Sequence, residues 1–285
     1  MSDSPYLKPA STLTYFAALV ADDASLHLLE AAAAIAQDRY PDFDVQAVLA
    51  EVDELARRLH QRLPADAAPA HRLRLLNHFF SQELGFAGNL NNYYEVDNSY
   101  VHRVLRTRRG IPVSLAVIYL ELAAQIGLQA CGVSFPGHFL IKLQLPQGDL
   151  VLDPLRCEPL SREALEEALQ PFRADWTSPQ PLERFLRPAT PRQVLARMLR
   201  NLKEIHRSEG DASAWLAVQQ RLVLLLPGEA AEWRDRGLAQ EAVGHWQGAV
   251  EDLRRYLELS PDASDAPEIA RRVQTLVARG APPMH

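Results

Sequence analysis

The chain has 285 residues, of which 47% are hydrophobic and 23% are charged, and its formal net charge is -6. This length and composition are typical of a globular protein with one large or two ordinary domains. The mildly acidic balance gives no electrostatic support for binding to nucleic acid or to an anionic membrane, and we expect neither as a partner.

Cysteine and histidine usage argues against two common kinds of site. The chain has only two cysteines, Cys131 and Cys157, so it has no disulfide framework and fits a reduced, cytoplasmic compartment. Neither cysteine has a partner at metal-ligand spacing, and the nine histidines include no pair four residues apart, so we expect no metal and no cofactor. Residues 1–16 lack the segments of a signal peptide, and the longest apolar runs are too short to span a bilayer.

Helical patterns dominate the first part of the chain. From Val45 to Leu59, apolar residues recur three and four positions apart, as they do on one face of a helix. The later segment GFAGNLNNYYEVDNS is rich in glycine and asparagine, which favour turns, and it is predicted to be an ordered loop. Three aromatic side chains are expected to pin this loop to the core: Phe86, Tyr93 and Tyr94.

The segment from Gly110 to Pro154 is predicted to form the centre of the fold. Pro112 suits the first turn of a helix, and the residues after it are apolar on nearly every side, which predicts a buried helix. Gly127 is expected to end this helix. Three short strands are predicted to follow, at residues 130–135, 138–145 and 150–153, and the last two form a hairpin.

From Thr190 onward the chain is predicted to be entirely helical and repetitive. Pro227 and Pro261 each close an apolar helix, and five residues between them fall at tetratricopeptide spacing: Trp233, Gly237, Ala249, Leu253 and Tyr256. The preceding unit departs from this pattern, because Lys203 stands where glycine is expected and Trp215 where a small residue is expected. Two units and a last helix are few for a free-standing solenoid, so we expect them to pack on the first domain.

Three residues of the central segment are candidates for one site. His138 follows Pro136-Gly137 at the head of a strand, and Asp153 ends the strand that should lie beside it, so the carboxylate could orient the imidazole. Ser114 lies in the first turn of the buried helix, where a nucleophile would belong. Each also has an ordinary structural interpretation: a histidine at a strand edge, an aspartate in a turn, and a serine that bonds a nearby backbone amide.

These features together resemble the transglutaminase-like, papain-like core, and more closely the bacterial SirB1 family. The resemblance lies in LGFAGNLNNYYEVDNSYVHRVLRTRRGIPVSLAVIYLELAAQIGL, SFPGHFLIKL, LVLDP and RMLRNLKEI. It implies an α+β fold, with a transglutaminase-like core of helices and a small antiparallel sheet over residues 1–188. An all-α tetratricopeptide-like region is implied over residues 189–285.

The resemblance also assigns roles to the three candidates. His138 matches the family's base, Asp153 its orienting acid, and Ser114 stands where active transglutaminases carry cysteine. The SirB1 family commonly lacks that cysteine, so the chain is expected to be a pseudoenzyme without thiol acyl transfer. It would act as a binding or regulatory module for a peptide or protein, through its cleft or its helical repeats.

Two alternatives remain open on the sequence alone. The chain could be a serine-dependent hydrolase or acyl transferase that uses Ser114, His138 and Asp153, or a scaffold in which all three residues are structural. Cys131 lies inside an apolar strand and Cys157 has no helix N-terminus beside it, so neither is expected to replace the missing nucleophile.

Overall fold

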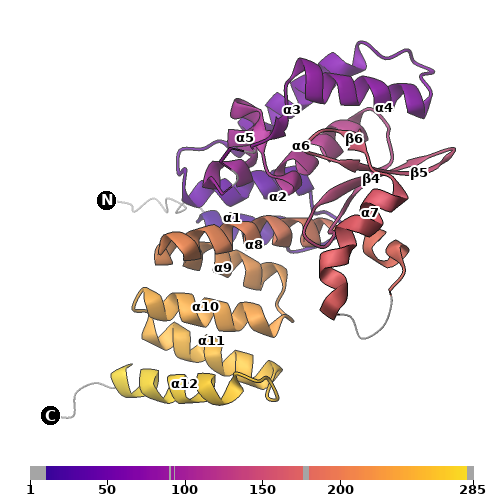
Figure 1. Cartoon of the computed structure of the whole chain (residues 1–285). Coiled ribbons are helices and arrows are strands. Elements are labelled where there is room, and N and C mark those ends of the chain that lie inside the picture. Colours follow the sequence, from indigo (N-terminus) through magenta and orange to yellow (C-terminus); the bar gives the residue numbers. More distant parts are fainter. Residues whose placement is uncertain (1–10, 90, 93, 176–179, 281–285) are drawn as a thin grey trace, which may run out of the picture.

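The computed structural model describes residues 11–89, 91–92, 94–175 and 180–280, which form a sheet-containing part and a stack of helices below it (Figure 1). The helices of the first part are α1 (Thr12–Leu19), α2 (Leu28–Ala34), α3 (Val45–His60), α4 (Pro69–Asn77), α5 (Val101–Thr107), α6 (Pro112–Gln125) and α7 (Arg162–Leu169). Shorter helical turns are η1 (Ile35–Asp38), η2 (His78–Glu83), η3 (Val96–Ser99), η4 (Gln170–Asp175) and η5 (Leu182–Leu186). The stack contains α8 (Pro191–Glu209), α9 (Ala212–Leu225), α10 (Ala230–Ala242), α11 (Trp246–Leu259) and α12 (Ala266–Gly280).

The buried helix α6 is the centre of the first part. Pro112 occupies its first turn, where the missing N–H costs no hydrogen bond, and its residues are buried from there through Tyr119. Helices α2, α3, α4, α5 and α8 and the sheet all pack against it. The helix ends at Gln125, and two residues later Gly127 has a φ of +73°, which suits glycine, and lacks a Cβ, which leaves room for the Arg72 side chain. Arg72 donates to the carbonyl of Ile126 at 2.8 Å. The prediction of a buried central helix is confirmed.

An antiparallel sheet of four strands follows α6 in the order β3 (Ala130–Val133), β4 (Leu140–Leu145), β5 (Gly148–Asp153) and β6 (Glu158–Pro159). One face of the sheet, with Ile141 and Leu152 paired in register, joins the main core. The other face, with Leu140 and Val151, packs with Leu165 of α7. A second, parallel pair joins β1 (Ala87–Gly88) to β2 (Arg109–Gly110). The predicted α+β class with a small antiparallel sheet is confirmed.

The loop between η2 and η3 is anchored differently from the prediction. Phe86 is buried and stacks on Phe80 with 4.4 Å between ring centroids, as expected. Tyr94 is 80% exposed, so the prediction that it pins the loop was wrong, and Tyr93 lies outside the described residues. Asn98 provides an anchor instead, since its buried side-chain amide donates to the carbonyl of Asn92 at 2.7 Å.

The helical stack explains why the first repeat unit departs from the pattern. At Gly237 a Cβ would lie 2.7 Å from the Leu253 side chain, so glycine allows α10 and α11 to pack closely. Lys203 occupies the equivalent place in α8 and is buried. Its ammonium lies 3.0 Å from Asp235 and 3.5 Å from Glu232 of α10, so an ion-pair network replaces the close packing. No helix in the described ranges is both long and apolar enough to cross a membrane.

The stack is fixed to the first part through two arginines. Arg221 of α9 has a side chain that is 1% exposed, and it pairs through both terminal nitrogens with Asp38 of η1. The ring of Phe16 in α1 lies 5.4 Å from its guanidinium. Arg192 of α8 donates to the carbonyl of Val20 at 2.7 Å. As expected, the repeats pack on the first domain.

The Arg221–Asp38 pair should dominate the stability of this junction. Replacing Asp38 by Asn leaves a buried guanidinium without its counter-charge, and we expect unfolding in urea to become easier by about 3–5 kcal/mol. Arg221→Met combined with Asp38→Asn should recover much of that loss. Removing the exposed Arg57–Glu54 pair with Arg57→Met should cost less than about 1 kcal/mol. An equal loss in Asp38→Asn and Arg57→Met would contradict this assignment.

Stability should also fall in acid because of His102. Burial lowers the pKa of His102 to about 4, with a smaller contribution from the neighbouring Arg103. Its Nδ1 is buried without a hydrogen-bond partner in the described structure. As the pH falls from about 6.5 towards 4, His102 therefore binds a proton in the unfolded chain but not in the folded chain, and the folded state loses stability.

Replacing His102 by Phe tests this effect, because its ring already packs against Phe43, with 4.4 Å between ring centroids. The free energy of unfolding of wild type, measured in urea, should fall between pH 7 and pH 4.5. His102→Phe should remove about 1–2 kcal/mol of that fall, an amount reduced to allow for solvent screening of a half-exposed ring. An identical pH dependence in both proteins would show that His102 does not cause the loss.

Candidate functional site

Ser114, the predicted nucleophile, is fully buried in the first turn of α6. Its hydroxyl oxygen lies 2.6 Å from the carbonyl oxygen of Asn98 and 3.0 Å from that of Ile111. The backbone N–H of Ile111 donates back to it at 3.2 Å. A Cβ at Gly110 would lie 2.8 Å from the same oxygen, so the backbone fits closely around it. Ser114 thus ties the end of η3 to the beginning of α6.

The first helix of the stack contributes to this burial. Helix α8 contacts both η3 and α6, and Met198 and Leu202 on its inner face are fully buried. Figure 1 shows α8 running beneath the first part, between it and the remaining helices of the stack. The position that would hold a nucleophile is therefore enclosed.

His138 and Asp153 lie at the same end of the sheet, because β4 begins and the antiparallel β5 ends there. His138 is exposed and lies two residues before β4. The prediction that it is the first residue of the strand was wrong. The reason is the turn before it, in which Gly137 has a φ of +70° and the N–H of His138 donates to the carbonyl of Phe135 at 3.0 Å. Asp153 shapes a second turn, since its carboxylate accepts the N–H of Leu155 at 2.8 Å.

Within the described residues, no hydrogen bond joins the side chains of Ser114, His138 and Asp153. The sheet brings His138 and Asp153 to the same end, whereas the hydroxyl of Ser114 points at backbone groups. The catalytic triad stays a prediction.

The two thiols do not replace the missing cysteine nucleophile. Cys157 is buried, and its pKa is raised to about 12, mainly by this burial and to a smaller extent by the negative charge of Asp153. Burial also raises the pKa of Cys131, which is half-buried in β3. Since the thiolate is the reactive form, neither side chain is activated at neutral pH.

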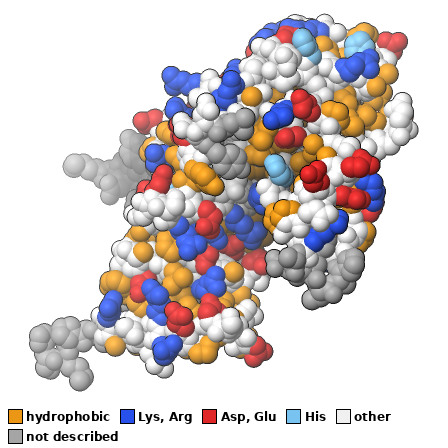
Figure 2. Space-filling model, viewed as in Figure 1, with side chains coloured by type: hydrophobic (Ala, Val, Ile, Leu, Met, Phe, Trp, Pro, Cys, Tyr) orange, Lys and Arg blue, Asp and Glu red, His pale blue; other side chains and the backbone are white. Residues whose placement is uncertain are grey.

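A groove runs along one side of α8, between the stack and the first part. Its larger cavity, about 720 Å³, lies between α8, the β3–β4 turn, the segment 184–189 and the α9–α10 turn. A second cavity of about 320 Å³ lies further along α8. Both cavities are lined by Asn201 and Glu204, so we call them together the interdomain groove. Figure 2 shows the surface hollowed between the sheet-containing part and the stack.

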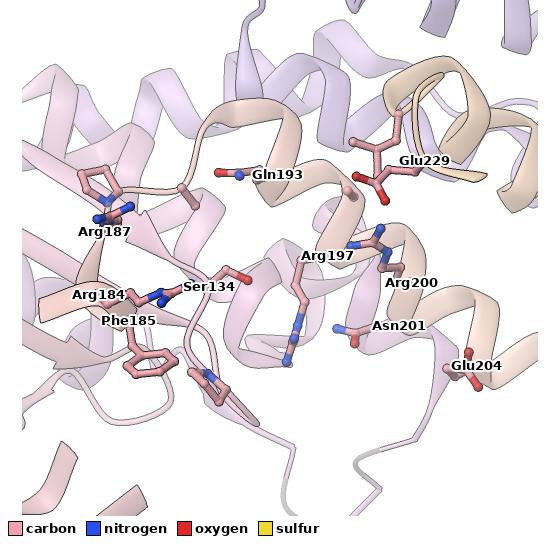
Figure 3. Close-up of a pocket in the computed structure, with 15 residues that line it drawn as sticks. Ser134, Arg184, Phe185, Arg187, Gln193, Arg197, Arg200, Asn201, Glu204 and Glu229 are labelled. Atoms are coloured by element: carbon pink, nitrogen blue, oxygen red, sulfur yellow. The ribbon is translucent and has the colours of Figure 1, made fainter. Parts of the chain in front are cut away.

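The larger cavity is lined by polar and basic side chains from several segments. In Figure 3, Arg184 and Arg187 extend from the segment 184–189, and Arg197 extends from α8 between Ser134 and Asn201. The smaller cavity is more apolar; its lining residues are Tyr94, Ser99, Ile111, Asn201, Glu204, Ile205 and Ser208.

The groove was not predicted from the sequence. Its α8 residues, from Gln193 through Arg197, Asn201 and Glu204 to Ser208, do recur three to four positions apart, which is a weak signal for one helix face. The segments opposite α8 come from distant parts of the chain. Within the described residues, no three histidine, cysteine or acidic side chains gather where they could hold a metal ion.

Comparison with known proteins defines the class. The family model of the transglutaminase-like superfamily matches residues 46–200, and a tetratricopeptide repeat model matches residues 202–274. Because the first match spans more than half of the chain, the chain belongs to the transglutaminase-like superfamily. The two matches meet inside α8, and the predicted domain boundary between residues 188 and 189 stays a prediction.

Individual relatives identify the family within this superfamily. A UPF0162 protein of Xylella fastidiosa is 37% identical over 242 residues, which cover 84% of this chain and 86% of the relative. A UPF0162 protein of Pseudomonas aeruginosa is 32% identical over 256 residues, which cover 90% of this chain and 92% of the relative. Protein SirB1 of Salmonella typhimurium is 26% identical over 238 residues, which cover 82% of this chain and 87% of the relative. The predicted resemblance to the SirB1 family is thus confirmed. No solved structure matches the chain.

The contacts of Ser114 predict a stability defect on its removal. Ser114→Ala removes one of the two donors to the carbonyl of Asn98, which keeps only the N–H of Ile111 at 3.2 Å, and should lower the free energy of unfolding by about 0.5–1.5 kcal/mol. Ser213 also lies in a first helical turn but is exposed, so Ser213→Ala should change stability by less than about 0.5 kcal/mol. Wild type should not react with a serine-directed fluorophosphonate. Labelling that Ser114→Ala abolishes, without loss of stability, would instead establish a catalytic serine.

Proposed function

We propose that this protein binds an extended segment of a partner protein in the interdomain groove and carries out no acyl transfer. The observation that carries the proposal is the groove itself, which runs along α8 where the transglutaminase-like part meets the repeats. Tetratricopeptide repeats mediate protein–protein interaction in general, and α8 belongs to both the groove and the stack.

The length of the groove fits a peptide. From Gln193 to Ser208, α8 rises by about 22 Å. An extended chain of about six or seven residues covers that distance. The lining offers amide and hydroxyl groups for backbone hydrogen bonds and apolar surface for side chains, the combination that peptide sites use.

The contacts at Ser114 support a binding role over catalysis. A serine nucleophile needs its proton taken by a nearby base, whereas the hydroxyl of Ser114 is within bonding distance of the Asn98 carbonyl and has no access to solvent. The serine-hydrolase alternative would require α6, η3 and α8 to separate around it. The unpaired cysteines fit action in the reducing cytoplasm, where partners of a regulatory protein would be found.

Blocking the shared middle of the groove should abolish binding. A displayed library of random decapeptides would be selected against the full chain, and the Kd of the enriched peptides measured by fluorescence polarisation. Asn201→Trp places a large ring at one of the two residues common to both cavities and should weaken binding at least tenfold. Glu167→Trp, at an exposed position of α7, should leave the Kd unchanged.

Thermal unfolding of both tryptophan variants would first establish that they are folded. The proposal is wrong if no peptide is enriched above the immobilisation matrix, or if the enriched peptides bind Asn201→Trp as tightly as wild type.

A further inference from the structure

We propose that the segment bound in the interdomain groove is acidic, and that Arg197 binds one of its carboxylates while an apolar side chain enters the smaller cavity. This inference rests on the proposed function and names the chemistry of the partner. It follows from charges, unpartnered side chains and distances along α8.

The larger cavity has a charge opposite to that of the whole protein. The chain carries 30 basic and 36 acidic side chains, yet four arginines line this cavity against two glutamates, Glu204 and Glu229. The four are Arg184, Arg187, Arg197 and Arg200. A basic cavity attracts anions, so it favours an acidic partner.

Not all of these cations are available to a ligand. Arg200 is neutralised by Glu232, 2.8 Å away, and Glu204 lies 3.5 Å from Arg207, outside the cavity lining. Arg197 is half-buried and, within the described structure, has neither a carboxylate nor a hydrogen-bond partner. Among other half-buried arginines, Arg103 lies 2.7 Å from Asp97 and Arg236 lies 2.6 Å from Asp252, whereas Arg58 lies against the ring of Phe79.

Arg197 is also placed to meet a ligand. It extends from α8 into the middle of the cavity, with Arg184 and Arg187 on the opposite wall (Figure 3). A planar guanidinium can donate two parallel hydrogen bonds to one carboxylate, and partial burial strengthens such a contact. The missing partner of Arg197 is therefore a carboxylate supplied by the bound segment.

The smaller cavity adds a second, independent feature. Ile111 and Ile205 provide apolar walls, and Ser99 lines the same cavity. Ser99 is 1% exposed and its hydroxyl has no hydrogen-bond partner in the described structure. A buried hydroxyl left unpaired is unfavourable, and a peptide backbone group entering with an apolar side chain would satisfy it.

The spacing of the two features defines a motif. Arg197 and Ile205 are eight residues apart on α8, which corresponds to about 12 Å. An extended peptide covers that distance in three or four residues. The bound segment should therefore contain an aspartate or glutamate and a large apolar residue three or four positions apart.

Three pools of fluorescein-labelled decapeptides test this motif on the full chain. All have leucine, isoleucine or phenylalanine at position 7 in a Gly/Ser/Asn background, and position 3 is acidic, neutral (Asn or Gln) or basic. Fluorescence polarisation should show the acidic pool binding on the order of tenfold more tightly than the neutral pool. The basic pool should bind most weakly.

Variants locate the preference. Arg197→Gln should remove the tenfold difference between the Kd values of the acidic and neutral pools. Arg197→Glu should favour the basic pool. The control is Arg254→Glu on the exposed surface of α11, which changes the net charge equally but lies outside the groove and should leave all three Kd values unchanged.

The outcomes separate the two proposals. Equal binding of the three pools, each blocked by Asn201→Trp, would overturn the acidic preference and leave the proposed function intact. Failure of every pool to bind would count against both. An acidic preference that persists in Arg197→Gln would assign recognition elsewhere. A ten-nucleotide RNA that binds in an Arg197-dependent manner and displaces the peptides would replace the acidic peptide as ligand.

Discussion

The arrangement of the whole molecule depends on one buried ion pair, between Arg221 of α9 and Asp38 of η1. A guanidinium that is 1% exposed has lost nearly all of its hydration, so it is tolerated only where a counter-charge and further contacts are fixed around it. Thr12 donates to the same carboxylate at 2.5 Å, and the ring of Phe16 lies beside the arginine. The stack cannot rotate away without separating these groups, and the interdomain groove is therefore formed before any ligand arrives, which lowers the entropic cost of binding.

The same junction accounts for both properties of the site. By holding α8 against η3 and α6, it encloses the first turn of α6, where Ser114 bonds the carbonyl of Asn98. An adjoining face of α8 then becomes a wall of the groove, with Arg197 and Asn201 on it. Closure of the nucleophile position and formation of a binding surface are thus two results of one packing arrangement. An enzyme built on this layout would have to keep α8 away from the helix start.

Sequence patterns predict the elements with strong local signals and miss those that depend on distant contacts. The buried helix after Pro112 and the hairpin around Gly148 are evident from periodicity and turn residues, because both are local. Strands as short as β1 and β6 carry too few residues for any periodicity. The packing of the repeats on the first domain was predicted, but nothing near Arg221 in the chain indicates that its partner lies 183 residues away, so neither the contacts of the junction nor the groove could be derived from the sequence. His138 was misplaced by two residues because the Pro136-Gly137 turn extends further than its residue types imply.

The triad-like order of residues also has a physical explanation that does not require catalysis. Ser114 joins η3 to α6, and Asp153 closes the turn after β5 through the N–H of Leu155, so each contributes to folding. His138 differs from both, since its side chain is exposed and forms no hydrogen bond within the described structure. An exposed imidazole of this kind adds little to stability. Pro136, two residues earlier in the same turn, lines the larger cavity. Of the three residues, Ser114 and Asp153 therefore make contacts that contribute to the fold, and His138 makes no such side-chain hydrogen bond within the described structure.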